Sequence, residues 1–419
     1  MSASAPNPSA ERLHALDAVR GFALLLGIAF HATLSFLPGP HQIWPVEDGH
    51  RSAALAVTFF SLHVFRMTTF FLIAGFFAHL TFHKRGARAF IRDRAKRIGL
   101  PLLVGWPFLF AGIVGVSLWA VLIANGGALP KGVLHPPPGP PLSFPLTHLW
   151  FLYFLLIFYA ATLAGRWVVT RLDAQCRVAA LADKLTAGLM ANPLGPVLLA
   201  APLAVALAFN RPWLMWFGIP TPDASLIPNL PAFVGFGVAF LFGWVLHRQA
   251  GLIRRLEGRW AFNLGFAALL IGGCLSWLGV TPVVTPAAQG WQTLTYGGAY
   301  ALATWCGAFG FIGMALRYLS KESPTRRYVA DASYWLYLIH MPIVMALQLA
   351  VSRLDWPAEV KFAAILAVAL PLMFASYELM VRHSFIGAVL NGRRVPRSAR
   401  LPNPSVARTH TEGPKELAR

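Results

Sequence analysis

Residues 54–82 read ALAVTFFSLHVFRMTTFFLIAGFFAHLTF, and this stretch decides the class of fold. Arg66 is the one Lys, Arg, Asp or Glu among them. About 20 mostly apolar residues are enough for an α-helix to cross the hydrocarbon core of a bilayer. We therefore predict a transmembrane helix here, long enough to be tilted or broken.

The composition of the whole chain agrees with a lipid environment. Of its 419 residues 57% are hydrophobic and 12% are charged, whereas soluble domains carry about 25% charged residues. Strands are not expected, because an open sheet edge cannot lie in lipid. The chain is predicted to be an all-α integral membrane protein with about ten transmembrane helices. These lie near 18–37, 54–82, 98–124, 147–165, 193–210, 229–246, 260–280, 291–316, 331–352 and 359–381.

The positive charge sets the expected topology. The net charge is +19, but Lys and Arg cluster between apolar segments, which argues against a nucleic-acid partner. With the N-terminus in the cytoplasm, 28 of the 35 basic residues fall on the inside and five on the outside. Both termini are therefore predicted to be cytoplasmic, with inside loops at 84–97 and 166–192. Residues 1–385 would form the transmembrane domain and 386–419 a basic, disordered cytoplasmic tail.

The three cysteines give no sign of a metal centre. Cys176, Cys274 and Cys306 are far apart, and none belongs to a CxxC pair. Neither a disulfide framework nor a zinc site is indicated, so no metal is expected.

The first predicted helix carries a polar stripe. Arg20 and His31 are eleven residues apart, which places them on one helix face about 16 Å apart along the axis. Asp17 lies one turn before Arg20 on the same face. Asp17 and Arg20 fit an interfacial ion pair that anchors the helix. His31 fits either a neutral packing group or a general base, since imidazole suits proton transfer near neutral pH.

Arg66 lies in the middle of an apolar run, where no snorkelling to the interface is available. It therefore needs an anion, carbonyl groups or water inside the bundle. One reading is a structural ion pair with Asp331 or Glu378. The other is a contact with an anionic or carbonyl group of a substrate.

Further polar residues stand at or near helix ends. Arg94 and Arg97 are one turn apart before the third helix, where positive-inside bias explains most of the charge, but such a pair is also able to clamp phosphates. His148 and Trp150 open the fourth helix at the outer interface. In the ninth helix, His340 follows Asp331 by nine residues, so it is expected at a depth similar to that of His31.

These motifs together resemble the acyltransferase-3 family of membrane-bound acyltransferases. The resemblance spans nearly the whole chain. It is carried by Arg20 and His31 with ten residues between them, Arg94 and Arg97 in an RxxR pattern, HLWFL from His148, and SYWLYLIH ending at His340.

The closest resemblance is to the branch that modifies periplasmic glucans. It is carried by HVFRM at 63–67 with Phe70 and Phe71, by RIGLP at 97–101 and by Tyr377-Glu378. Ala74 departs from the family, in which many members have Ser before Gly-Phe. The resemblance implies a multi-pass protein of the bacterial inner membrane that moves a succinyl group from cytoplasmic acyl-coenzyme A to a glucan, with no bound cofactor.

The resemblance and the polar residues together suggest roles. His31 would act as base or covalent acyl relay, Arg20 and Asp17 would orient donor and helix, and Arg94 and Arg97 would bind acyl-coenzyme A. The candidates for substrate binding are Arg66, His63, His340, Tyr337, His148 and Trp150.

Two other functions remain open from the residues alone. Intramembrane His, Arg and Asp side chains are also able to form an ion or proton path in a polytopic transporter. No internal symmetry of the kind typical of transporters is visible. A membrane scaffold or sensor without catalysis is the third reading. The sequence gives no oligomeric state.

Overall fold

The computed structural model describes residues 8–39, 44–130, 142–288 and 290–392. Its regular elements there are helical, and one isolated bridge joins Ser143 and Ser225. The α-helices are α1 Pro8–Thr33, α2 Ala53–Arg94, α3 Leu100–Ala124, α4 Trp150–Leu172, α5 Arg177–Ala191, α6 Gly195–Ala208, α7 Leu230–Leu246, α8 Trp260–Leu278, α9 Trp291–Tyr318, α10 Pro324–Val351, α11 Ala358–Ser376 and α12 Phe385–Leu390. Short 3-10 or π segments are η1 Leu34–Phe36, η2 Ala95–Gly99, η3 Thr147–Leu149, η4 Met215–Phe217, η5 His247–Leu256 and η6 Tyr377–Val381.

The all-helical prediction is confirmed for the described chain, and each of the ten predicted stretches lies on helical segments. By length and apolarity, eight helical segments are able to cross a membrane, or nine if a bent pair counts as one span. The bent pair is α5 and α6, which meet at 110°. The continuous helical run from Ala53 to Ala124 counts as one segment. The number of about ten spans and the cytoplasmic termini stay predictions.

Two segments expected to be inside loops are helical. The first, 84–97, continues α2 into η2, and its backbone leaves helical geometry at Gly86, where φ is 74°. The second, 166–192, forms the end of α4 and all of α5. Both lack proline, and the first is rich in Ala, Arg and Lys and the second in Ala, Leu and Arg, all of which favour helix. The many charges of these segments indicate that they lie in water, but charge does not prevent a segment from being helical.

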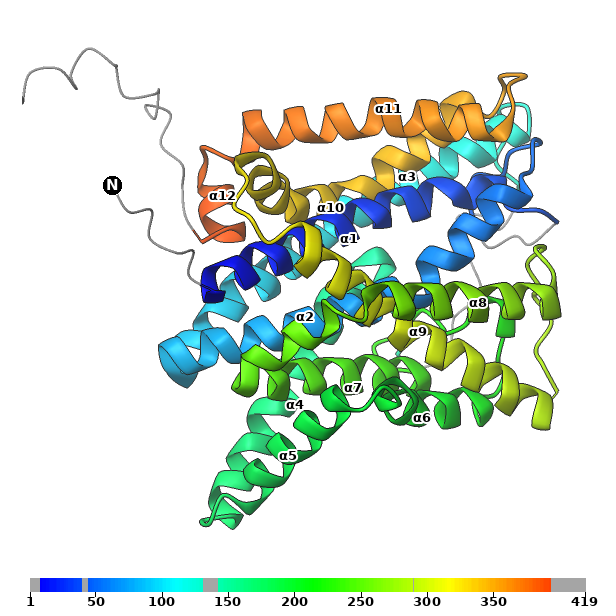
Figure 1. The fold of residues 1–419 in the computed structure, drawn as a ribbon. Helices are drawn as coiled ribbons and strands as arrows, with labels where there is room; N and C mark the ends of the chain where they lie inside the picture. Colours follow the sequence, from blue (N-terminus) through cyan, green and yellow to red (C-terminus); the bar gives the residue numbers. More distant parts are fainter. Residues whose placement is uncertain (1–7, 40–43, 131–141, 289, 393–419) are drawn as a thin grey trace, which may run out of the picture.

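The helix α1 runs through the middle of the bundle. It packs against α10, α2 and α9, while α2 also packs against α7 and α9. Figure 1 shows α1 in dark blue between α10 and α2, with α4 and α5 extending from the lower edge of the bundle. This arrangement brings the polar residues of α1 and α2 to the same interior as those of α10.

The crossing of α2 and α7 depends on two glycines. A Cβ at Gly75 would overlap the carbonyl oxygen of Phe240, and a Cβ at Gly243 would overlap that of Leu72. The helix backbones therefore touch at this point, as small residues permit in membrane bundles. The contact fixes the position of α2, which carries Arg66.

The predicted cytoplasmic tail lies mostly outside the described residues, which end at position 392. The part of it that is described includes α12, so residues 386–390 are helical.

Candidate active site

Two cavities lie between α1, α2, α4 and α10. The histidine cavity has a volume of about 220 Å³, and its lining includes His31, His63, His148 and His340. The arginine cavity has a volume of about 210 Å³, and its lining includes Arg20, Arg94 and Arg97. Arg20 and His31 are eleven residues apart on α1, so the two residues lie about 16 Å apart along that helix, one in each cavity.

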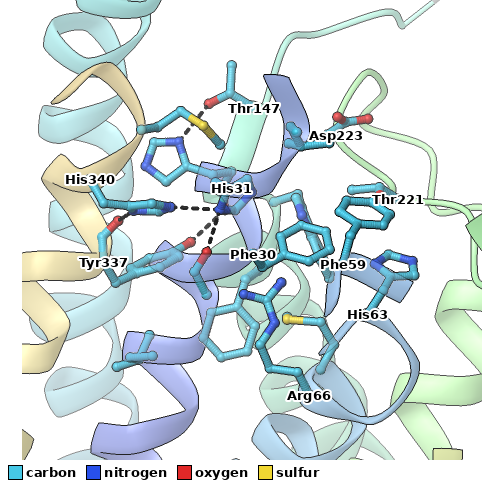
Figure 2. A pocket seen from close by; sticks show the side chains of 18 of the residues that line it. Phe30, His31, Phe59, His63, Arg66, Thr147, Thr221, Asp223, Tyr337 and His340 are labelled. Carbon is cyan, nitrogen blue, oxygen red and sulfur yellow. Dashed lines mark hydrogen bonds between the residues drawn. The ribbon is translucent and has the colours of Figure 1, made fainter. Parts of the chain in front are cut away.

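The imidazole ring of His31 forms its hydrogen bonds through one nitrogen, Nδ1. Its Nδ1 lies 2.9 Å from the carbonyl oxygen of Gly27 and 3.0 Å from Nε2 of His340. The side-chain amide of Gln348 donates to the carbonyl oxygen of His31 at 3.0 Å. The same Gln348 accepts from the indole of Trp44, whose ring lies over that of His31. These contacts set both the backbone and the ring of His31, and Figure 2 shows the hydrogen bond between His31 and His340.

A proline explains how His148 reaches this interior. Pro342 has no N–H, so the carbonyl oxygen of Leu338 in α10 lacks its usual helical donor. Nε2 of His148, at 2.9 Å, donates to that oxygen instead. The hydroxyl of Tyr337 donates to the carbonyl oxygen of His148 at 2.7 Å. The start of α4 is thereby tied to α10 beside His340.

Arg66 is a buried cation that forms no ion pair with a carboxylate of the described residues. Its side chain is 7% exposed, its Nε has no hydrogen-bond partner, and its guanidinium lies 4.4 Å from the ring centre of Phe30. The predicted alternative of an ion pair with Glu378 or Asp331 is wrong. Glu378 pairs with Arg382, and Asp331 lines the arginine cavity. An unpaired charge at this depth is costly, so Arg66 is a candidate contact for an anionic or dipolar group.

Aromatic rings cover the wall beside Arg66. The ring of His63 stacks on Phe59 and Phe30, with centroids 5.8 and 5.4 Å apart. Phe59 stacks in turn on Trp216. The wall is therefore flat and apolar, with the guanidinium at its end (Figure 2).

The arginine cavity combines cations with a few fixed acceptors. Arg94 donates to Thr81 at 3.0 Å, and Arg97 donates to the carbonyl oxygen of Asn391 at 2.9 Å. Asp93 lies 3.3 Å from Nε of Arg97 and offsets part of the charge. The π-helical turn η2, which contains Arg97, joins α2 to α3 at this cavity. Such turns recur at functional sites.

The two cavities share part of their lining. Four residues border both of them: Leu24, Phe70, Phe151 and Tyr337. We call these four side chains the partition. Because they are the boundary of each cavity, the cavities adjoin one another within the bundle.

The structure brings most of the predicted site residues together, in two groups. Asp17 pairs with Arg20 at 3.3 Å, as expected for an interfacial pair, and it lines neither cavity. Arg20 lines the arginine cavity and not the cavity of His31. All six predicted substrate-binding residues line the histidine cavity: Arg66, His63, His340, Tyr337, His148 and Trp150.

Several lining residues were not predicted from the sequence. Trp44 borders the histidine cavity from the loop after η1, and Thr221 and Asp223 border it from a loop far away in the chain. Figure 2 shows Thr221 and Asp223 on the opposite side of the cavity from His340. In the sequence, Thr221 and Asp223 stand out only as two polar residues in a proline-rich segment. That pattern does not predict that they line a cavity. Among the described residues, no group of three or more His, Cys, Asp or Glu is arranged to hold a metal ion.

Comparison with known proteins gives a family. The acyltransferase domain family matches residues 13–378, which include the whole lining of the histidine cavity. Glucans biosynthesis protein C of Escherichia coli (strain SMS-3-5 / SECEC) is 34% identical over 100 residues, which is 24% of this chain and 25% of that protein. This chain thus spans a quarter of that relative's length.

A longer match has lower identity. Glucans biosynthesis protein C of Escherichia coli O6:K15:H31 (strain 536 / UPEC) is 23% identical over 347 residues, which is 80% of this chain and 83% of that protein. No solved structure matches. Because the family match covers most of the chain and contains the histidine cavity, this multi-pass membrane protein belongs to the acyltransferase-3 family.

Proposed function

We propose that this protein is a membrane-bound O-acyltransferase that moves a succinyl group from cytoplasmic acyl-coenzyme A to hydroxyls of a periplasmic glucan or a related cell-envelope glycan. One observation carries the proposal. A cationic cavity adjoins a cavity that holds His31 and an unneutralised Arg66, and the two share the partition. A donor and an acceptor from two compartments would meet at this boundary.

The arginine cavity is the proposed donor site. Arg94 and Arg97 would hold phosphates of coenzyme A, since guanidinium groups bind phosphate oxygens in pairs. Arg20 would orient the donor from α1, and Asp17 would steady Arg20 through their ion pair. The thioester would then point toward the partition.

The histidine cavity is the proposed acceptor site. Its flat wall of aromatic rings suits the C–H faces of a sugar, and Thr221 and Asp223 offer polar groups for hydroxyls. Cavities of this kind commonly combine an apolar lining with a few placed polar groups. His31 would take the proton from the attacking hydroxyl.

Arg66 is the proposed partner of the acyl group. Its guanidinium would pair with the free carboxylate of a succinyl group or stabilise the charge that develops on the acyl carbonyl oxygen. Within the described ranges no carboxylate pairs with Arg66, which supports this role, because an anionic substrate group would supply the missing charge.

The reaction balances without a further reactant. The acceptor oxygen bonds to the acyl carbon, the C–S bond of the thioester breaks, and the hydroxyl proton passes through His31 to the departing thiolate. The products are an acyl ester and free coenzyme A. If His31 instead carries the acyl group as a covalent relay, an acyl–nitrogen bond forms on His31 as the C–S bond breaks, and it breaks again when the acceptor oxygen bonds to the acyl carbon. The net reaction is the same.

Labelled acyl-coenzyme A tests the function. Purified protein is incubated with succinyl-coenzyme A, with and without glucan, and free coenzyme A and glucan esters are measured. We expect glucan-dependent release, and a loss of about 10²- to 10⁴-fold in His31→Ala. Phe22→Ala, at an exposed position of the same helix, should keep the rate. Wild-type protein without glucan-dependent release contradicts the function, and a fully active His31→Ala contradicts the base.

Comparing two donors tests the role of Arg66. In Arg66→Gln we expect succinyl transfer to fall by roughly 10- to 100-fold more than acetyl transfer, because a hydrogen bond to a charged group contributes about 1.5–3 kcal/mol. Equal losses with succinyl- and acetyl-coenzyme A would remove carboxylate recognition and leave the carbonyl role.

No observation favours the transporter. The bent pair α5 and α6 contributes no residue to either cavity. A transporter would also show no coenzyme A release that depends on glucan, so the same assay separates the two functions.

A further inference from the structure

The hydrogen bonds around His31 determine which ring nitrogen carries its proton. The carbonyl oxygen of Gly27 lies 2.9 Å from Nδ1 of His31. A carbonyl oxygen is only an acceptor, so Nδ1 must be the donor and must carry a hydrogen. In the neutral ring, Nε2 of His31 then has the free lone pair.

A second carbonyl group leads to the same result independently. Nδ1 of His340 lies 2.6 Å from the carbonyl oxygen of Tyr337, so this nitrogen of His340 is also the donor. The Nε2 of a neutral His340 is therefore an acceptor. It lies 3.0 Å from Nδ1 of His31, which must donate to it. Two separate carbonyl groups thus assign the same tautomer to His31.

The other nitrogen of His31 faces the cavity. Within the described part of the chain, no protein group forms a hydrogen bond to Nε2 of His31. His31 is partly exposed and lines the histidine cavity, whereas His340 is 2% exposed with both ring nitrogens engaged. Figure 2 shows the His340 ring directed at His31. His340 is therefore in a position to orient a base, and His31 to act as one.

We propose that His340 is a positioning residue that holds His31 as the Nδ1–H tautomer, so that Nε2 of His31 is the atom that receives the proton of the acceptor hydroxyl. The proposal rests on the function given above. It assigns His340 to the support of His31 rather than to direct substrate binding. Tyr337 contributes through its backbone carbonyl group.

The arrangement allows proton transfer without movement of either ring. When the hydroxyl oxygen attacks the acyl carbon, its proton bonds to Nε2 of His31, and Nδ1–H continues to donate to His340 and Gly27. The imidazolium is then stabilised by the lone pair of His340 and by the Gly27 carbonyl oxygen. The proton leaves from Nε2 to the thiolate, and the starting tautomer is restored. A base oriented by a third group is the general logic of such sites.

Nitrogen NMR tests the tautomer without any assay of activity. Protein labelled with ¹⁵N-histidine is studied in lipid nanodiscs, and the His31 signals are assigned by their loss in His31→Gln. We expect a protonated Nδ1 and an unprotonated Nε2 in the neutral state. In His340→Leu we expect part of the His31 population to shift to the Nε2–H form. A wild-type His31 protonated at Nε2 alone overturns the proposal, even if the protein transfers succinyl groups.

Two variants separate positioning from packing. The side-chain oxygen of Gln reaches as far as Nε2 of histidine and accepts a hydrogen bond, whereas Leu does not. We expect kcat to fall on the order of 10²-fold in His340→Leu, to be partly rescued in His340→Gln, and KM for acyl-coenzyme A to change little in both. His14→Gln, on α1 outside both cavities, is the control.

Each outcome bears on the inference. Equal kcat in the Leu and Gln variants, or a loss confined to KM, overturns it. An inactive wild-type protein whose His31 has the expected tautomer would count against the proposed function and leave the hydrogen-bond assignment intact.

Discussion

Gly27 makes room for Arg66. A Cβ at position 27 would overlap Nη1 of the Arg66 guanidinium, which is the far end of a flexible side chain. Gly27→Ala is therefore expected to leave the fold intact and to displace the guanidinium. Succinyl transfer should fall more than acetyl transfer, in the same direction as in Arg66→Gln. The measurement is the ratio of the succinyl-transfer rate to the acetyl-transfer rate.

The control for Gly27→Ala is Gly265→Ala in α8. A Cβ at Gly265 meets no atom within 4 Å, so the ratio should not change. An unchanged ratio in Gly27→Ala as well would show that the guanidinium tolerates the added methyl group.

Lys361 and Asp48 form the most deeply buried ion pair outside the two cavities among the described residues. Nζ of Lys361 lies 2.8 Å from both carboxylate oxygens of Asp48, and the two side chains are 0% and 1% exposed. Lys361→Met removes the ammonium partner of a buried carboxylate and leaves it with contacts to His50, whose backbone N–H donates to Oδ1 of Asp48 at 2.8 Å. We expect stability to fall by about 3–5 kcal/mol, seen as a lower Tm in detergent.

A double variant checks the cause of that loss. Asp48→Leu combined with Lys361→Met removes both charges and should recover much of the stability. The prediction fails if Lys361→Met melts at the wild-type temperature. The pair ties α11 to the segment before α2, which also carries Trp44 over His31.

At the scale of elements, the contact of α2 with α7 should be the most sensitive crossing. The group that a Cβ at Gly75 would meet is the Phe240 carbonyl, which is backbone and has no other conformation within α7. Gly75→Ala is expected to destabilise the bundle by about 1–3 kcal/mol. Thermal unfolding measures it, with Gly265→Ala as the matched control. Equal Tm values for the two variants would contradict direct backbone contact.

For the whole molecule, the partition between the cavities is the decisive feature. Leu24 borders both cavities from α1. Leu24→Trp adds bulk there, so we expect transfer to the glucan to fall at least about 10-fold while coenzyme A still binds to the arginine cavity. Calorimetric titration with coenzyme A and the transfer assay measure the two effects. Phe22→Trp, exposed on the same helix, is the control. Normal transfer in Leu24→Trp would mean that the reactants do not meet at the partition.

The helices and part of the site were predictable because their signals are local. Apolar runs located ten stretches that all lie on helical segments, and the spacing of Arg20 and His31 predicted their common face on α1. The limits of helices in the charged segments 84–97 and 166–192 were not predictable in this way. The charge of a segment indicates whether it lies in water, whereas its helix propensity depends on the conformational preferences of the same side chains.

What the sequence determined by itself was a membrane bundle with cations and imidazoles inside it, since insertion into lipid depends on composition along each segment. The packing of helices decided the rest. It placed His340 against His31 across 309 positions of sequence and left Arg66 without a carboxylate partner from the part of the chain that the structure describes. It also divided the polar interior into two adjoining cavities and brought Asp223 to one of them. These contacts depend on how helices that are distant in the sequence cross one another, and a local pattern of residues does not predict that crossing.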